Sequence, residues 1–305
     1  MELAQLLLTE RLGRVIRAIP VSERKELQEI RLRRNKKLSA VAYGFEYFIT
    51  PNGKMMRSPS LAADITEDDI MFTYKSALKH SLYAFEREIS QGYITTEGGN
   101  RVGFCGKAVY DTSTGVLCSL NDISSINIRI AREINGCAGE IFERFYSSNP
   151  VSMLICGPPS SGKTTLLRDL CRYLSEKYTV SLIDERNEIA SVYNGVPQND
   201  VGSRTDVFTS YDKYSAIMIS VRVMAPQIII CDEIGGSDEL KALEYALYSG
   251  VKLIATCHAG SFAELKRRPV ISKLIKANAF EKAVLLRGQP FCGKPEAFYD
   301  LGGKE

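Results

Sequence analysis

A glycine-rich segment in the middle of this 305-residue chain has the residue types that bind phosphate. It follows an apolar run, precedes a helical pattern and has the form G-x-x-x-x-G-K-T. Glycines let successive backbone N–H groups point at phosphate oxygens, and the helix N-terminus adds partial positive charge. Lys163 can reach the β and γ phosphates, and the Thr164 hydroxyl can ligate Mg²⁺. We therefore predict an ATP-binding loop made of Gly157, Pro158, Pro159, Ser160, Ser161, Gly162, Lys163, Thr164 and Thr165.

Two adjacent carboxylates end a second apolar run, Ile228–Cys231. In phosphate-loop NTPases an acid at this point holds Mg²⁺ through water, and a neighbouring Glu can polarise the attacking water. We assign Asp232 to the metal and Glu233 to general-base catalysis. The alternative is a strand end that merely reaches solvent.

Two further apolar runs also end in polar residues. His258 directly follows one of them, in the position of a sensor beside the γ-phosphate, although a single histidine is more often structural. Asp184 and Glu185 end the other, and either carboxylate could reach the water shell of the metal. An ordinary solvated acidic loop is the competing interpretation, and we keep Glu185 as a catalytic candidate. The second histidine, His80, has no assigned role.

Strand and helix patterns alternate in the part of the chain that carries these groups. Apolar strands are expected over residues 151–156, 179–184, 227–232 and 251–256, with helices over residues 162–177, 211–223 and 237–248. The strands are continuously apolar, which is typical of a parallel sheet covered on both faces. We therefore predict a wound α/β domain, in which ligands bind at the carboxyl ends of the strands.

The beginning of the chain has a different pattern. The expected elements are helices over residues 2–19 and 66–89, and strands over residues 30–38, 41–49, 93–96, 102–110 and 126–130. These elements form an α+β region. The sequence therefore predicts a smaller N-terminal α+β domain, residues 1–130, and an α/β ATPase domain, residues 131–305.

Composition narrows the class of protein. Apolar residues make up 45% of the chain, charged residues 25%, and the net charge of +3 is too small to identify a nucleic-acid or lipid binder. No run approaches the roughly 18 apolar residues of a membrane-spanning helix, and the N-terminal apolar run lacks the features of a signal peptide. The eight cysteines form no C-x-x-C pair. We expect a cytosolic protein without disulfides or a zinc site.

With these motifs in order, the chain resembles the secretion-superfamily ATPases, the hexameric motors of type II and type IV secretion. The matching segments are the phosphate loop, residues 184–188, Asp232-Glu233 and residues 255–258. Residues 125–133, 200–207, 224–226 and 230–236 look more closely like the stage III sporulation branch of these ATPases. Two features depart from the wider superfamily, because Asp232-Glu233 replaces Gly-Glu and the tetracysteine module of many type II ATPases is absent.

The resemblance implies a RecA-like P-loop NTPase core that binds ATP and Mg²⁺. It also implies a homo-oligomer, a hexameric ring, that works with membrane-embedded channel platform proteins from the cytoplasm of the mother cell. Hydrolysis in such rings occurs at subunit interfaces, where arginines stabilise the transferring phosphoryl group. Arg129 and Arg132, in the segment that joins the domains, are catalytic candidates, and further candidates are Arg101, Arg204 and Arg222. A surface ion pair is the alternative for each arginine.

Three functions remain open at this point. The first is an ATPase motor of a sporulation-specific, secretion-like channel, in which hydrolysis drives rotation of the two domains. The second is a nucleic-acid-dependent ATPase, but the basic clusters at residues 31–37 and 266–276 lack adjacent aromatic residues for base stacking, so nucleic acid is not the expected partner. The third is a structural protein that uses nucleotide to assemble a ring and hydrolyses little.

Overall fold

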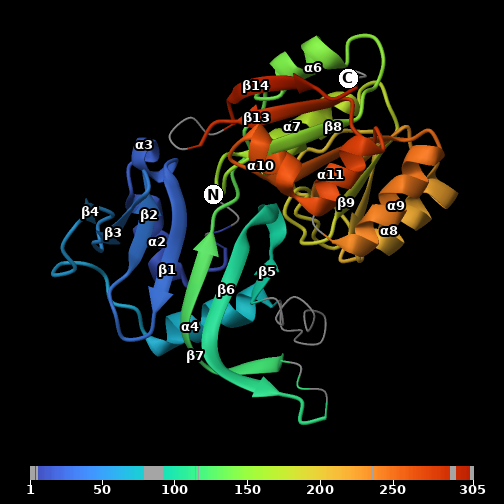
Figure 1. The fold of residues 1–305 in the computed structure, drawn as a ribbon. Helices are drawn as coiled ribbons and strands as arrows, with labels where there is room; N and C mark the ends of the chain where they lie inside the picture. The colour runs from blue at the N-terminus through green and yellow to red at the C-terminus, as the bar shows by residue number, and fades with distance from the viewer. Residues whose placement is uncertain are drawn as a thin grey trace. The chain divides into compact units, whose positions relative to one another are not determined.

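The chain divides into two compact units, residues 1–132 and 133–305, in a computed structural model (Figure 1). The structure describes residues 4, 6–78, 92–113, 115, 117–234, 236–288 and 293–302. His80 and the last part of the helix predicted over residues 66–89 lie outside these described residues. Each unit has its own sheet and its own hydrophobic core.

The first unit is built on an antiparallel sheet with the strand order β4-β3-β2-β1-β7-β6-β5. Its strands are β1 (Leu27–Arg33), β2 (Ser39–Ala42), β3 (Phe45–Ile49), β4 (Met55–Met56), β5 (Tyr93–Thr95), β6 (Arg101–Tyr110) and β7 (Leu117–Arg129). Its helices are α2 (Glu10–Ala18), α3 (Val21–Arg24), α4 (Glu67–Ala77) and the short 3-10 turn η2 (Glu97–Gly99). Ile30 and Leu32 of β1 are fully buried, whereas Arg31 and Arg33 are half-exposed. One face of this sheet therefore packs on the core and the other is polar.

Side-chain caps set where the two longer helices of this unit begin. The Thr9 hydroxyl accepts a hydrogen bond from the Leu12 N–H, so α2 begins at Glu10, and the helix predicted over residues 2–19 is interrupted by the non-helical residues 6–9. Thr66 and Asp69 form a reciprocal capping box at the start of α4. The Asp69 carboxylate is buried and also accepts a hydrogen bond from the Thr9 hydroxyl at 2.6 Å. Asp69 therefore ties the beginnings of α2 and α4 together.

The second unit has a sheet with the strand order β10-β9-β11-β12-β8-β13-β14. Its strands are β8 (Met153–Gly157), β9 (Val180–Asp184), β10 (Thr205–Thr209), β11 (Ile228–Glu233), β12 (Lys252–His258), β13 (Lys282–Leu286) and β14 (Pro295–Asp300). Every neighbouring pair is parallel except β13 with β14. Separate core clusters cover the two faces, which confirms the predicted parallel sheet buried on both sides.

Helices connect these strands. They are α6 (Gly139–Phe145), α7 (Lys163–Leu174), α8 (Lys213–Ile219), α9 (Ser237–Tyr248), α10 (Phe262–Arg267) and α11 (Pro269–Lys276). The helix predicted over residues 211–223 is instead α8 followed by a π-helical turn, η3 (Ser220–Met224), and the next residue, Ala225, is left-handed with φ 47°. None of the helices within the described ranges has the length and apolar character needed to cross a bilayer.

Three strands of the second sheet were not predicted. β10 and β14 are edge strands with polar and half-exposed residues, so they lack the continuous apolar run that marks the central strands. β13 is apolar but short, and an isolated apolar run of this length does not distinguish strand from helix.

Candidate nucleotide site

The order of strands in the second sheet brings the separate sequence motifs to one edge. β12 lies between β8 and β11, and β9 lies on the other side of β11. His258 at the end of β12 pairs in register with Gly157 of β8, whereas Glu233 of β11 pairs with Thr256. The histidine therefore lies between the phosphate loop and the carboxylates of β11. Sequence spacing alone does not reveal this order.

The loop between β8 and α7 is shaped by its two glycines. Gly162 has φ 86°, in the left-handed region, and caps α7. A Cβ atom on Gly157 would lie 2.4 Å from the Ser161 hydroxyl oxygen, so no larger residue fits there. Pro159 and Ser160 form the exposed crest, and Ser160 is also left-handed, with φ 58°. This backbone curls as a phosphate cradle must.

A polar ligand fits this loop. The Ser161 hydroxyl oxygen is buried and has no hydrogen-bond partner within the described part of the chain. Such an atom is costly to bury alone, so a ligand that reaches it would satisfy it. Thr164 and Thr165 lie in the first turn of α7, where backbone N–H groups have no partner inside the helix.

Lys163 is buried and folds back across the loop. Its Nζ donates hydrogen bonds to the carbonyl oxygens of Gly157, at 3.0 Å, and Pro158, at 2.8 Å. The same ammonium lies 3.1 Å from Nδ1 of His258. Burial lowers the pKa of Lys163, and the carboxylate of Glu233 acts in the opposite direction. Lys163 is thus held by the loop and linked directly to the histidine of β12.

His258 connects the phosphate loop to the candidate general base. Its Nε2 lies 3.5 Å from Oε2 of Glu233. Because the Lys163 ammonium can only donate, Nδ1 of a neutral His258 accepts, and the ring proton is assigned to Nε2, facing the carboxylate. The side chains of His258 and Glu233 are 35% and 41% exposed, so water can reach both. His258 therefore joins the Lys163 ammonium and the Glu233 carboxylate in one series of contacts.

An irregularity in β11 separates the two adjacent carboxylates. The pairing of β11 with β12 shifts between Cys231 and Glu233, and such bulges redirect side chains. Asp232 forms an ion pair with Lys213 of α8, in which Nζ and Oδ1 are 2.9 Å apart. Burial raises the pKa of Asp232, and the Lys213 ammonium opposes that rise. Sequence reasoning missed Lys213, because a lysine at the start of a helix matches no motif.

Asp184 has a structural role at the end of β9. Its carboxylate is fully buried and accepts hydrogen bonds from the backbone N–H groups of Glu188, at 2.8 Å, Ile189, at 3.0 Å, and Ala190, at 2.8 Å. Asp184 therefore organises the loop that follows β9, and this loop is not an ordinary solvated acidic loop. Because its carboxylate already accepts these three hydrogen bonds, Asp184 is not a free metal ligand. Oε2 of Glu185, by contrast, lies 3.8 Å from the Lys213 ammonium that pairs with Asp232.

We expect Asp184→Ala to lower the free energy of unfolding by about 3 kcal/mol, because three buried backbone N–H groups lose their acceptor. The measurement is urea unfolding followed by circular dichroism. The matched control is Glu185→Ala at the neighbouring half-exposed position, which should change stability by roughly 0.5 kcal/mol or less. Equal effects of the two substitutions would show that Asp184 does not hold the loop.

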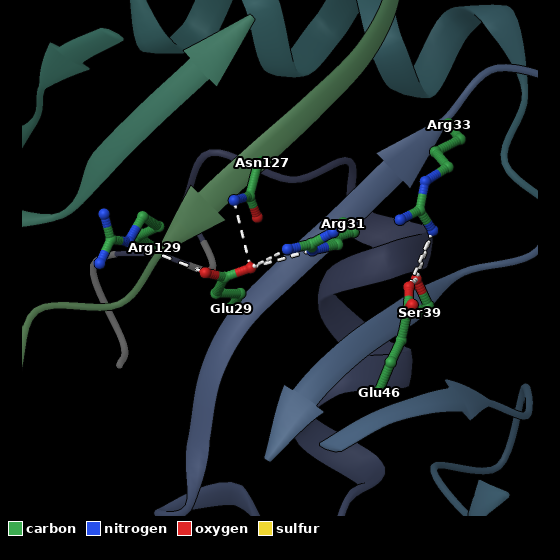
Figure 2. A network of polar contacts seen from close by, with 7 residues as sticks. All are labelled: Glu29, Arg31, Arg33, Ser39, Glu46, Asn127 and Arg129. Carbon is green, nitrogen blue, oxygen red and sulfur yellow. Dashed lines mark hydrogen bonds and ion pairs between the residues drawn. The ribbon is translucent and has the colours of Figure 1, made fainter. Parts of the chain in front are cut away.

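Arg129 lies in a polar network on the outer face of the first sheet (Figure 2). Glu29 accepts hydrogen bonds from Arg31, at 2.7 Å, and from Asn127, at 3.2 Å, and its other oxygen lies 3.8 Å from Nε of Arg129. The Arg129 side chain is 65% exposed. Its guanidinium is therefore only loosely held within its own unit.

Arg132 is held more firmly. It donates hydrogen bonds to the carbonyl oxygens of Lys25, at 2.6 Å, and Leu27, at 3.1 Å, and its Nη1 lies 3.6 Å from Glu26. These contacts use its guanidinium inside the first unit. The remaining candidates are Arg101, stacked over the Tyr93 ring, Arg204, bonded to the Glu176 carbonyl, and Arg222, exposed in η3.

Comparison with solved structures defines the class of this fold. The ATPase DotB of Legionella pneumophila aligns with a TM-score of 0.54 at 17% identity, over 85% of this chain and 72% of that chain. The pilus retraction motor PilT with bound ADP aligns with a TM-score of 0.58 at 14% identity, over 91% and 79%. The predicted fold is confirmed: a RecA-like P-loop core with a smaller N-terminal α+β unit.

Sequence comparison identifies the family within this class. The model of the family "Sporulation stage III, protein AA" matches residues 2–305, and the chain belongs to that family. Stage III sporulation protein AA of Bacillus subtilis (strain 168) is 33% identical over 308 residues, which cover 99% of this chain and 95% of the relative. The uncharacterized protein ycf45 of Cyanidium caldarium is 30% identical over 76% of this chain and 67% of its own length. The resemblance to the stage III sporulation family is confirmed.

Proposed function

We propose that this protein is the Mg²⁺-dependent ATP hydrolase of a sporulation-specific, secretion-like channel apparatus. The observation that carries the proposal is the line of contacts from Lys163 through His258 to Glu233, beside the phosphate loop. A cation that could contact the phosphates of ATP is thereby connected to a carboxylate that could take a proton from water.

The chain offers oxygen ligands that fit Mg²⁺, the metal that such ATPases use. Mg²⁺ is usually held by one or two protein groups together with substrate phosphates and water. Thr164 supplies a hydroxyl and Asp232 a carboxylate at the edge of the sheet where the phosphate loop lies. When bound with ATP, the metal would neutralise part of the phosphate charge.

Each side chain of the site has a separate role in the proposed hydrolysis of ATP. The loop of residues 157–165 binds the phosphates through its backbone N–H groups, and Lys163 turns from its loop carbonyls to the phosphate oxygens. Glu233 accepts the proton of the attacking water as general base. His258 orients Glu233 through Nε2–H and responds to the phosphate through Lys163. Glu185 contributes negative charge near Asp232, because both carboxylates contact the Lys213 ammonium.

We further propose that the protein works as a hexameric ring that hydrolyses ATP at subunit interfaces to drive rotation of its domains, residues 1–130 and 131–305. The fold that it shares with PilT, whose structure is described as that of a motor, supports this proposal. Arg129 and Arg132 are the candidates to act on a neighbouring subunit's ATP, and Arg129 is the more exposed. The ring would act from the mother-cell cytoplasm, bound to membrane-embedded platform proteins.

The mass of the protein in solution tests the ring. With Mg²⁺ and a non-hydrolysable ATP analogue, we expect assembly into a ring, while Lys163→Ala should not respond to the analogue. A monomer under all conditions would contradict the motor proposal.

ATP turnover should not rise when single-stranded DNA is added. A stimulation that fades as salt is raised would instead favour the nucleic-acid-dependent ATPase.

A further inference from the structure

Lys213 lies at the centre of a group of carboxylates. Its Nζ lies 2.9 Å from Oδ1 of Asp232, 3.7 Å from Oε1 of Glu239 and 3.8 Å from Oε2 of Glu185. The same ammonium donates a hydrogen bond to the backbone carbonyl of Glu233. Only 10% of the lysine side chain is exposed. One buried ammonium is therefore shared by three carboxylates from separate parts of the second unit.

The groups around Lys213 are fixed in place. Asp212 caps α8 by accepting a hydrogen bond from the Ser215 N–H at 2.9 Å, which sets the position of the lysine in the first turn. Glu239 accepts a hydrogen bond from the Gly236 N–H at 3.1 Å through the oxygen that does not face Lys213. The Lys213 ammonium therefore contacts acceptors that are held in place by other contacts, unlike an exposed lysine in a surface ion pair.

The position of Lys213 bears on metal binding, because Asp232 is the carboxylate proposed to hold Mg²⁺. Oδ1 of Asp232 is buried, and the Lys213 ammonium lies 2.9 Å from it, while Arg186 is a second positive charge that acts on the same carboxylate. Without the lysine, the buried Asp232 carboxylate would lose its nearest positive charge, and Arg186, which also lowers the pKa of Asp232, would be the cation left to compensate it. With the lysine present, a free cation must displace or approach a fixed positive charge.

We propose that Lys213 is a positioning residue: its ammonium forms an ion pair with the Asp232 carboxylate until Mg²⁺ binds together with ATP. It holds the Asp232 carboxylate in place and disfavours binding of a divalent cation to Asp232 in the absence of nucleotide. The negative phosphates of ATP then supply the charge that lets the metal approach. This inference rests on the proposed function in one respect: it takes Asp232 as the carboxylate that binds Mg²⁺.

The test is binding of Mn²⁺, as a probe for Mg²⁺, to nucleotide-free protein, followed by electron paramagnetic resonance. We expect Lys213→Gln to bind Mn²⁺ at least about tenfold more tightly than wild type, because the fixed positive charge is gone while a hydrogen-bond donor remains. Lys213→Arg keeps the charge and should behave as wild type. Adding Asp232→Asn to Lys213→Gln should abolish the gain. Equal Mn²⁺ affinity in wild type and Lys213→Gln would overturn the proposal.

A second comparison needs no substitution of the lysine, in case its variants fail to fold. Wild type and Asp232→Asn should bind Mn²⁺ equally weakly without nucleotide, since Lys213 already occupies the carboxylate. Tighter binding by wild type would show that Asp232 takes the metal with Lys213 in place, and would also overturn the proposal. Neither titration contains nucleotide, so failure of the protein to hydrolyse ATP is a separate result that concerns the proposed function alone.

Discussion

Glu233→Gln is expected to lower the maximal rate of ATP hydrolysis by about 10³-fold, since a general base typically contributes 10² to 10⁴. The glutamine amide keeps the size of the side chain but cannot accept the proton of the attacking water. His258 Nε2 lies 3.5 Å from the glutamate oxygen and can still face the amide oxygen of the variant, so the local packing should persist. ATP affinity should change little, because Glu233 does not belong to the phosphate loop.

Two measurements distinguish this loss from a binding defect. Phosphate release gives the rate, and equilibrium titration with a fluorescent ATP analogue gives the affinity. The matched control is Glu143→Gln on α6, an exposed carboxylate in the same unit, which should leave both unchanged. If Glu233→Gln hydrolysed ATP at the wild-type rate, another group would have to be the base.

Lys163→Ala is expected to weaken ATP binding by at least about 100-fold, because charge-assisted contacts to phosphate contribute roughly 1.5–3 kcal/mol each and we expect the lysine to contact two phosphates of bound ATP. The substitution also removes the hydrogen bonds of the ammonium to the loop carbonyls and its contact with His258, so thermal unfolding without ATP is needed to show that the variant is folded. Calorimetric titration with ATP measures the affinity.

Thermal unfolding with and without ATP provides a second readout for Lys163→Ala. Saturating ATP should raise the Tm of wild type, as any ligand that binds only the native state does, and should barely change the Tm of the variant. Lys241→Ala, on the exposed surface of α9, is the matched control and should respond as wild type does. A Lys163→Ala protein that bound ATP normally would remove the lysine from the binding site.

The core of the second unit could be predicted from sequence because its signals are local. Continuously apolar runs indicated β8, β9, β11 and β12, and the G-x-x-x-x-G-K-T motif lies between a strand and a helix as required. The sequence also places His258 and Glu233 at strand ends. His258 contacts both Lys163 and Glu233 because β12 lies between β8 and β11. Strand order is a property of the tertiary structure and cannot be read from the local sequence.

The features that sequence reasoning missed depend on distant parts of the chain. Lys213 becomes part of the site only because α8 brings it to the carboxyl end of β11, and nothing in its neighbourhood along the chain signals this. Asp184 has the same residue type as a metal ligand, but three backbone N–H groups of the following loop use its carboxylate. Burial and hydrogen bonding, not residue type, separate its role from that of Asp232.

Phosphate release by the wild-type protein tests the central claim most directly. ATP should be hydrolysed with Mg²⁺ and not when the metal is removed by EDTA, and the rate per subunit should rise with protein concentration as subunits assemble. Absence of phosphate release at every concentration, with ATP shown to be bound, would contradict the hydrolase and favour a protein that uses nucleotide only to assemble.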